Sequence, residues 1–155
     1  VDNAPAMAKR CNANIKADPS SVPVEVRCED ILQTRIHNAS MVVMNFTLMF
    51  IEPEQRLSLL RKIYQGLNSG GVLILSEKME ESDSGSQHTL TELYYGFKKI
   101  RGYSDLEISQ KRSALENVLI PESSEAHMAR LNRSGFAQSA IWFKCFGFTS
   151  IIASK

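Results

Sequence analysis

Two rhythms of hydrophobic and polar positions alternate along the chain, and they predict an alternating order of helices and strands. Apolar residues recur every four positions between 7 and 15, which predicts a helix with Asn3 as its cap and Pro5 in its first turn. Strict alternation over 22–26 predicts a short strand that stops near Cys28. The same alternation of periods along the rest of the chain is typical of an α/β fold.

The middle of the chain continues this pattern with longer apolar runs. The continuous run Met41–Phe46 predicts a strand that is covered on both faces. A helix opened by residues 52–54 follows, and we expect residues 68–71 to end it in left-handed backbone conformations. Its predicted buried stripe consists of Leu57, Leu60, Ile63, Tyr64 and Leu67. Residues 72–75 then predict a second buried strand.

The second half is expected to be a helical insertion followed by an antiparallel hairpin. Residues 77–136 predict helices around 90–100 and 105–118, and a third capped by Ser123 or Ser124. Residues 140–146 and 148–153 predict the hairpin. A connection between parallel strands needs only about a dozen residues, and residues 77–136 are far more than that. We expect the additional helices to cover a ligand or form a dimer contact; the alternative is that they only pack against the sheet. The fold class is therefore α/β, with a mainly parallel sheet.

Composition and charge disfavour several classes of protein, including nucleic-acid-binding, membrane-spanning and metal-binding ones. A net charge of +1, with 43% hydrophobic and 23% charged residues, predicts an ordinary globular domain without a nucleic-acid-binding charge excess. The longest apolar stretch, 41–51, is shorter than the ~20 residues of a membrane helix. Three isolated cysteines predict reduced thiols in a cytosolic protein, and three scattered histidines predict no metal site. These residues are Cys11, Cys28, Cys145, His37, His88 and His127.

Polar residues stand at the ends of the predicted strands, where open α/β sheets bind ligands. They are Asp2, Asp30, Asn45 and the pair Ser76-Glu77, with Val1-Asp2 interpreted as the last residues of a strand. A carboxylate at such a position can accept hydrogen bonds from a ribose diol, and the next strand end can accept from an adenine amino group. Each residue alone could equally be a helix cap or a turn residue, but four in register favour a nucleoside site. No glycine-rich phosphate-binding motif is present.

At these positions the sequence resembles known enzymes. Four segments, Asp2–Met7, Cys28–Ile31, Met41–Leu48 and Leu67–Gly71, are similar to class I S-adenosylmethionine-dependent methyltransferases. Residues 63–68, 75–78 and above all 102–113 resemble the bacterial carboxy-S-adenosyl-L-methionine synthase family. The likeness runs over essentially the whole chain, and the Ser-Gln-Lys-Arg segment at 109–112 separates this family from ordinary methyltransferases.

The resemblance implies a reaction and the residues for it. The family converts S-adenosyl-L-methionine and prephenate into carboxy-S-adenosyl-L-methionine, phenylpyruvate and water, with no metal. Carried over by position, the resemblance implies ribose contacts from Asp2 and Asn3, adenine contacts from Asp30 and Ile31, a place beside the ligand for Asn45, and carboxylate binding by Arg112.

Arg112 is the candidate catalytic residue. A guanidinium offers a carboxylate two parallel hydrogen bonds, and its charge would stabilise the carboxylate that forms when the sulfonium ylide captures carbon dioxide. Without the resemblance, a solvated arginine on an amphipathic helix is the simpler interpretation. Lys98, Lys99 and Arg101 are interpreted as a solvated helix end, where cations are favoured.

The family's first strand and glycine-rich loop have no counterpart in these residues. We therefore expect residues 1–155 to be the carboxyl-terminal part of an S-adenosylmethionine-binding domain whose amino-terminal portion is missing. Residues 77–136 are expected to be a lid and the dimer region.

The resemblance also implies partners and a location. It implies a cytoplasmic homodimer that passes its product to a transfer RNA carboxymethyltransferase, for modification of the wobble uridine. Direct contact with nucleic acid or membrane is not expected. Two alternatives stay open: a methyltransferase acting on a small molecule or RNA, and a non-catalytic ligand-binding or dimerisation domain.

Overall fold

The computed structural model describes residues 1–116 and 118–155. They form two compact units, Val1–Arg35 and Ile36–Lys155, and each is described by itself.

The first unit contains helix α1, Pro5–Ala17, with proline at its start as expected. The prediction that Asn3 caps it is wrong, because Ala4 is the cap residue and no side chain caps the helix. Instead, Asp2 Oδ1 accepts a hydrogen bond from the Ala4 amide at 2.8 Å, which fixes the approach to the helix. Only Ala8 of this helix is buried; of its predicted apolar face, Met7 and Cys11 are exposed and Ile15 is half-buried.

The predicted strand at 22–26 does not form. The segment makes one parallel bridge, between Asp2 and Cys28. In this bridge the Asp2 amide donates to the Arg27 carbonyl at 3.1 Å, and the Glu29 amide donates to the Asp2 carbonyl at 3.2 Å. A strand persists only where a neighbour pairs with its backbone groups, and within this unit Asp2 alone pairs with the segment through a bridge.

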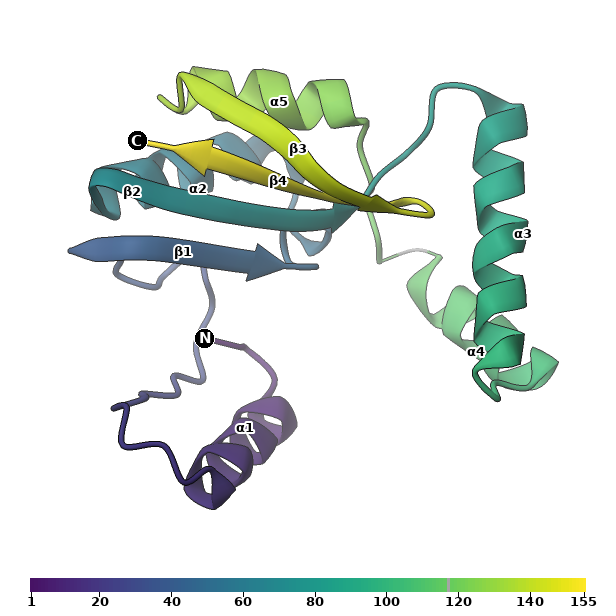
Figure 1. The fold of residues 1–155 in the computed structure, drawn as a ribbon, viewed down its shortest axis with the longest axis horizontal. Helices are drawn as coiled ribbons and strands as arrows, with labels where there is room; N and C mark the ends of the chain where they lie inside the picture. Colours follow the sequence, from purple (N-terminus) through teal and green to yellow (C-terminus); the bar gives the residue numbers. More distant parts are fainter. Residues whose placement is uncertain (117) are drawn as a thin grey trace. The chain divides into compact units, whose positions relative to one another are not determined.

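The second unit is built on a sheet of order β1-β2-β4-β3 in the part of the chain that is described (Figure 1). β1 and β2 are parallel, whereas β4 runs antiparallel to both β2 and β3. The predicted terminal hairpin is thus confirmed, and the sheet is mixed, less parallel than the pattern suggests. The strands are β1 Ala39–Asn45, β2 Leu67–Lys78, β3 Gln138–Cys145 and β4 Phe148–Ser154.

Helices α2, Pro53–Gly66, and α5, Ser124–Arg133, pack against each other and against β2 and β3. The fully buried side chains of this layer include Leu59, Leu60, Ile63, Leu73, Leu75, Leu131 and Ile151. Tyr64 and Leu57 of the predicted stripe are only half-buried, and Leu59 takes the expected place of Leu57 in the core.

The expectation that residues 41–46 are covered on both faces is wrong. β1 is an edge strand of this sheet, and only one of its faces points toward the helical layer. Met44 is buried, whereas Met41 and Val43 are 55% and 52% exposed. Alternate side chains of a strand point to opposite faces, so the continuous apolar run has one buried and one open side.

The expected helix end at 68–71 is also wrong. α2 ends at Gly66, with Leu67 as an extended cap residue, and residues 68–71 lie inside β2. Gly70 has a φ of +74° within this strand. These residues continue the strand because they pair with the carboxyl-terminal residue of the chain. The Gly70 amide donates to the Lys155 carbonyl at 3.0 Å, and the Lys155 amide donates to the Gly71 carbonyl at 2.9 Å.

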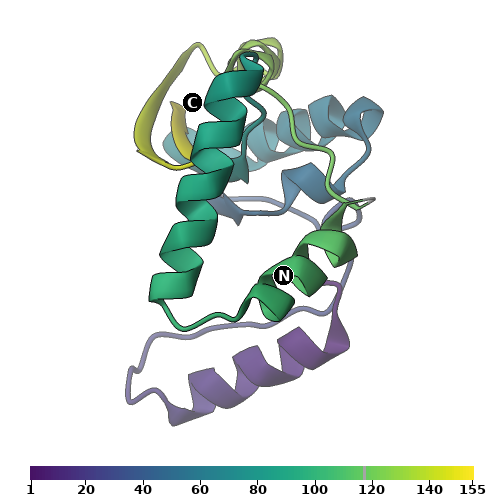
Figure 2. The same ribbon diagram turned by 90° about the vertical axis from the view of Figure 1, so that its right-hand side faces the viewer.

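Helices α3, Ser84–Ile100, and α4, Asp105–Leu115, extend beyond the strand ends, and we call residues 84–115 the arm (Figures 1 and 2). Side chains cap both helices: Asp83 accepts from the Ser86 amide, and Ser104 and Glu107 form a capping box. The helix expected over 105–118 ends at Leu115, and Asn117 lies outside the described residues.

The third helix of the predicted insertion, α5, belongs to the sheet layer and not to the arm, and Ser123 caps it as expected. A short 3-10 helix, η1, covers Leu48–Phe50. In the described parts of the chain, no helix combines the length and apolar character needed to cross a membrane.

Candidate active site

The turn that follows β1 is held by a buried carboxylate. Glu77 Oε1 accepts from the amides of Thr47 and Leu48 at 3.1 and 2.8 Å, and Oε2 accepts from Met49 at 3.1 Å. Burial raises the pKa of Glu77, although these three N–H donors act in the opposite direction. The sequence placed Ser76-Glu77 directly after a strand ending at residue 75, but both residues lie inside β2, which continues to Lys78. From this position Glu77 organises the turn after Asn45.

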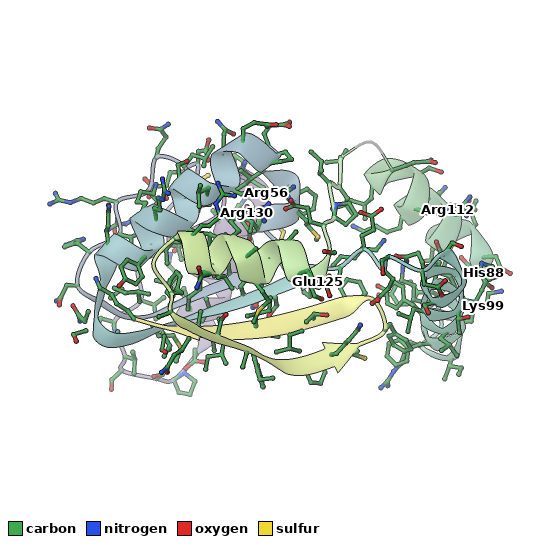
Figure 3. All side chains as sticks on the ribbon, turned by 90° about the horizontal axis from the view of Figure 1, so that it is seen from above. Arg56, His88, Lys99, Arg112, Glu125 and Arg130 are labelled. Atoms are coloured by element: carbon green, nitrogen blue, oxygen red, sulfur yellow. The ribbon has the colours of Figure 1, made fainter. Side chains whose placement is uncertain are left out.

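A buried ionic network holds the chain segment that returns from the arm. The Ile120 amide donates to the Met49 carbonyl at 2.9 Å, which joins this segment to η1. Arg56 of α2 donates to the Ile120 carbonyl at 2.7 Å and pairs with Glu122, which also pairs with Arg130 of α5. Figure 3 labels the two arginines of this network. Burial raises the pKa of Glu122, but the two guanidinium groups outweigh it and hold that pKa below its usual range.

Sequence reasoning missed this network. Arg56 lies at the helical spacing of the buried residues Leu59, Leu60 and Ile63, and its side chain is fully buried. A charged residue in register with an apolar stripe was the available signal, because lysine and arginine are almost never fully buried unless they are paired.

A cavity of about 800 Å³ lies between the ends of the strands, η1 and the arm. This volume is in the range of small-molecule sites, about 300–1,000 Å³. Its wall is mainly apolar and aromatic, and the residues that matter below include Phe46, Tyr94, Phe97, Arg112, Phe146 and Phe148.

Aromatic rings join the arm to the sheet at this cavity. Tyr94 of α3 lies 5.1 Å from Phe148 and 5.7 Å from Phe146, measured between ring centroids. Phe97 lies 5.6 Å from Phe146, and Phe46 lies 5.6 Å from Phe148. These separations are those of favourable aromatic pairs, so the same rings both line the cavity and attach α3.

Two of these phenylalanines have strained backbones. Phe46 and Phe146 have φ values of 53° and 52°, a region that bulky residues rarely adopt. Phe46 follows β1, and Phe146 is the first turn residue between β3 and β4. Such strain costs roughly 1–3 kcal/mol and is concentrated at binding sites, which marks this end of the sheet as the candidate site.

The cavity is electropositive. Lys78, Lys98, Lys111 and Arg112 line it, and Glu116 is the one acidic residue among the described residues of the wall. An apolar cavity with this excess of cations favours an anionic ligand that carries a hydrocarbon or aromatic group.

Lys98 and Lys99 behave differently, although the sequence predicted that both are solvated. Lys99 is exposed and pairs with Asp105 at 2.7 Å, as that prediction requires. Lys98 is half-buried and lines the cavity, with its Nζ atom 4.4 Å from the centroid of the Tyr94 ring. The prediction is therefore wrong for Lys98.

The predicted nucleoside residues fall in both units. In the first unit, no strand forms, but the isolated Asp2–Cys28 bridge brings Asp2 beside the segment that precedes Asp30. Oδ1 of each carboxylate accepts a local amide at 2.8 Å, from Ala4 and Leu32 respectively, as in the turn interpretation. The second oxygen of each carboxylate takes no part in these two bonds. Asn3 is exposed and Ile31 is half-buried.

In the second unit, Asn45 is the exposed last residue of β1, directly before the cavity residue Phe46. Arg112 lies on α4 and lines the same cavity; Figure 3 labels it in the arm, away from Arg56 and Arg130. The structure thus brings Arg112 and the end of β1 to one site. Among the residues described, no group of three His, Cys, Asp or Glu side chains could hold a metal ion.

Comparisons with known proteins fit this architecture. A family model described as a methyltransferase domain matches residues 1–75. The chain is 56% identical over all of its 155 residues to carboxy-S-adenosyl-L-methionine synthases from Hahella chejuensis and Pectobacterium atrosepticum, and it spans 62% and 63% of their lengths. The solved structure of an S-adenosylmethionine-dependent methyltransferase from Thermotoga maritima superposes with a TM-score of 0.62 at 15% identity, over 99% of this chain and 70% of that one. This last likeness confirms the methyltransferase-like α/β fold.

Proposed function

Because the chain is homologous over its full length to carboxy-S-adenosyl-L-methionine synthases, we propose that it carries the site of such an enzyme, a transferase that uses S-adenosyl-L-methionine and prephenate. One observation supports this reaction above others: Arg112 lines an aromatic, cation-rich cavity at the carboxyl end of β1. Methyl transfer creates no carboxylate that would need such a residue, whereas carboxylation of the methyl group does.

The proposed binding residues for the adenosyl part follow from the strand ends. Asp2 and Asn3 hold the ribose region, and Asp30 and Ile31 hold the adenine. The Asp2–Cys28 bridge, which brings Asp2 beside the segment before Asp30, supports this assignment, since each carboxylate has an oxygen beyond the one used in its turn. Asn45 lies beside the ligand at the end of β1.

The proposed chemistry balances without a metal. The sulfonium methyl group loses a proton to give an ylide, and prephenate loses carbon dioxide and its ring hydroxyl to become phenylpyruvate. The ylide carbon forms a bond with the carbon dioxide, and the released hydroxide and proton leave as water. Arg112 binds the new carboxylate through a charged, bidentate hydrogen bond and stabilises it as it forms.

We further propose the partners that the resemblance implies. The protein acts in the cytoplasm as a homodimer and passes its product to a transfer RNA carboxymethyltransferase, without itself binding nucleic acid. The arm is the proposed dimer region, and its exposed apolar residues support this: Leu93, Phe97, Ile100, Tyr103 and Leu106 are between 41% and 86% exposed. The net charge of +1 supports the absence of direct RNA binding.

Mass spectrometry of the adenosyl product, with and without prephenate, tests the reaction on the whole protein. A carboxylated sulfonium that forms only with prephenate is the expected result. A methylated acceptor without that sulfonium would instead favour a methyltransferase. Calorimetric titration with S-adenosylhomocysteine tests the alternative of a non-catalytic domain. Such a domain, lacking the adenosyl site, would show no binding.

A further inference from the structure

Lys98 is the cavity lysine whose ammonium group is recorded over aromatic rings, unlike two other lysines that have carboxylate partners. Lys99 and Lys144 each pair with a carboxylate at 2.7 Å. No acidic partner within ion-pair distance is found for Lys98 among the described residues. Its Nζ atom lies 4.4 Å from the ring centroid of Tyr94 and 5.9 Å from that of Tyr95. Ring faces attract an ammonium group without neutralising it, so a positive charge is held at the cavity wall.

The surroundings of Lys98 suit a ring with a carboxylate attached. Tyr94 and Phe97, on the same helix, meet Phe146 from the hairpin turn. These rings offer flat apolar surface beside the ammonium group. Arg112 stands on the other helix of the arm and lines the same cavity. Of the four cations that line the cavity, Lys98 and Arg112 therefore stand on different helices of the arm, α3 and α4.

We propose that Lys98 binds the side-chain carboxylate of prephenate, the one that phenylpyruvate retains, while the aromatic wall holds the ring. This assignment rests on the proposed function. Prephenate carries two carboxylates. The one that is transferred ends on the adenosyl product, to which Arg112 is assigned, so the other needs a separate cation. Lys98 is then a specificity-determining residue for the co-substrate and not for the adenosyl ligand.

The test compares Lys98→Met with Lys99→Met in the whole protein. The two lysines are adjacent on α3, but Lys99 is exposed and does not line the cavity. Losing a charged hydrogen bond should raise KM for prephenate by about tenfold or more in Lys98→Met. The dissociation constant of phenylpyruvate, measured by calorimetry, should rise by a similar factor. Binding of S-adenosylhomocysteine should stay within about twofold. Lys99→Met should change none of these values, and Lys98→Arg should restore most of the loss.

Other results would overturn the assignment. Unchanged prephenate KM in Lys98→Met would do so, and so would equal effects of the two methionine variants. Weakened S-adenosylhomocysteine binding in Lys98→Met would show a structural role instead. If the wild type forms no carboxylated product, the proposed function fails, but the phenylpyruvate titration still decides on Lys98. Binding that weakens only in Lys98→Met supports the subsite, and absence of binding to the wild type refutes it.

Discussion

Replacing Glu122 by glutamine should destabilise the protein through the buried charge that it leaves behind. Glu122 lies between Arg56, whose side chain is 0% exposed, and Arg130, whose side chain is 12% exposed. Glutamine keeps the shape but removes the charge. Arg56 would keep its bonds to the carbonyls of Ile51 and Ile120, both at 2.7 Å, but would lose its ion-pair partner.

The magnitude follows from this geometry. Removing one partner of a fully buried ion pair costs about 3–5 kcal/mol. Glu122 is 20% exposed, and the glutamine oxygen still accepts one hydrogen bond, so both facts reduce the cost. We expect Glu122→Gln to lower the free energy of unfolding by about 2–4 kcal/mol at neutral pH.

The effect should depend on pH in one direction. The pKa of Glu122 is lowered from 4.5 in the fold, so its stabilising contribution is complete above that value. It is lost as the pH falls through the folded-state pKa. The difference in stability between wild type and Glu122→Gln should therefore be largest at neutral pH and shrink in acid.

Urea unfolding followed by circular dichroism measures this difference, and hydrogen exchange at the Ile120 amide reports it locally. Glu80→Gln is the matched control, because Glu80 is exposed and its amide bonds to the Glu122 carbonyl without using the Glu80 side chain. Equal unfolding free energies for wild type, Glu122→Gln and Glu80→Gln would refute the reasoning, since the carbonyl partners would then suffice for Arg56.

Four further substitutions test other parts of the structure. Arg112→Ala should weaken binding of the carboxylated product by about 1.5–3 kcal/mol in calorimetry while sparing S-adenosylhomocysteine; equal losses for both ligands would contradict a carboxylate-binding role. Burial lowers the pKa of His127 from 6.5 to about 4. The contribution of neutral His127 to the free energy of unfolding should therefore be complete above pH 6.5 and fall by up to about 3 kcal/mol as the pH drops through 4. Urea midpoints across that window should show this fall in wild type and not in His127→Gln. Gly135→Ala should lower the urea midpoint, because Gly135 has a φ of +112° and an added Cβ would lie 2.8 Å from the Tyr64 ring. Gly96→Ala, where nothing lies within 4 Å, should raise the midpoint, consistent with about 0.5–1 kcal/mol.

The order of elements could be predicted because it depends on local periodicity. The helix that became α2, the parallel β1–β2 pair and the terminal hairpin all follow from spacing along the chain. Burial depends on what packs opposite, which periodicity does not contain. Met41 and Val43 look like core residues in sequence, yet they lie on the open face of an edge strand.

The site was predictable only in part, for a related reason. Asn45 and Arg112 were identified from strand ends and from resemblance; Arg112 lines the cavity and Asn45 directly precedes the cavity residue Phe46, while their roles stay predictions. Lys98 was missed because Lys98, Lys99 and Arg101 form one basic cluster in sequence. Lys98 and Lys99 point to different sides of α3. Lys98 lies over the Tyr94 ring, whereas Lys99 lies beside Asp105.

The cavity and the attachment of the arm depend on the same contacts. α3 has no buried residue, and α4 has one, Ile108, which is still 7% exposed. The described ring contacts of α3 with the sheet run from Tyr94 and Phe97 to Phe146 and Phe148. Each such pair contributes about 0.5–1.5 kcal/mol beyond its buried area, and these contacts offset the strain at Phe146. Because the rings that hold the arm are also the cavity wall, a substitution that weakens one of them should loosen the arm and degrade the binding site together.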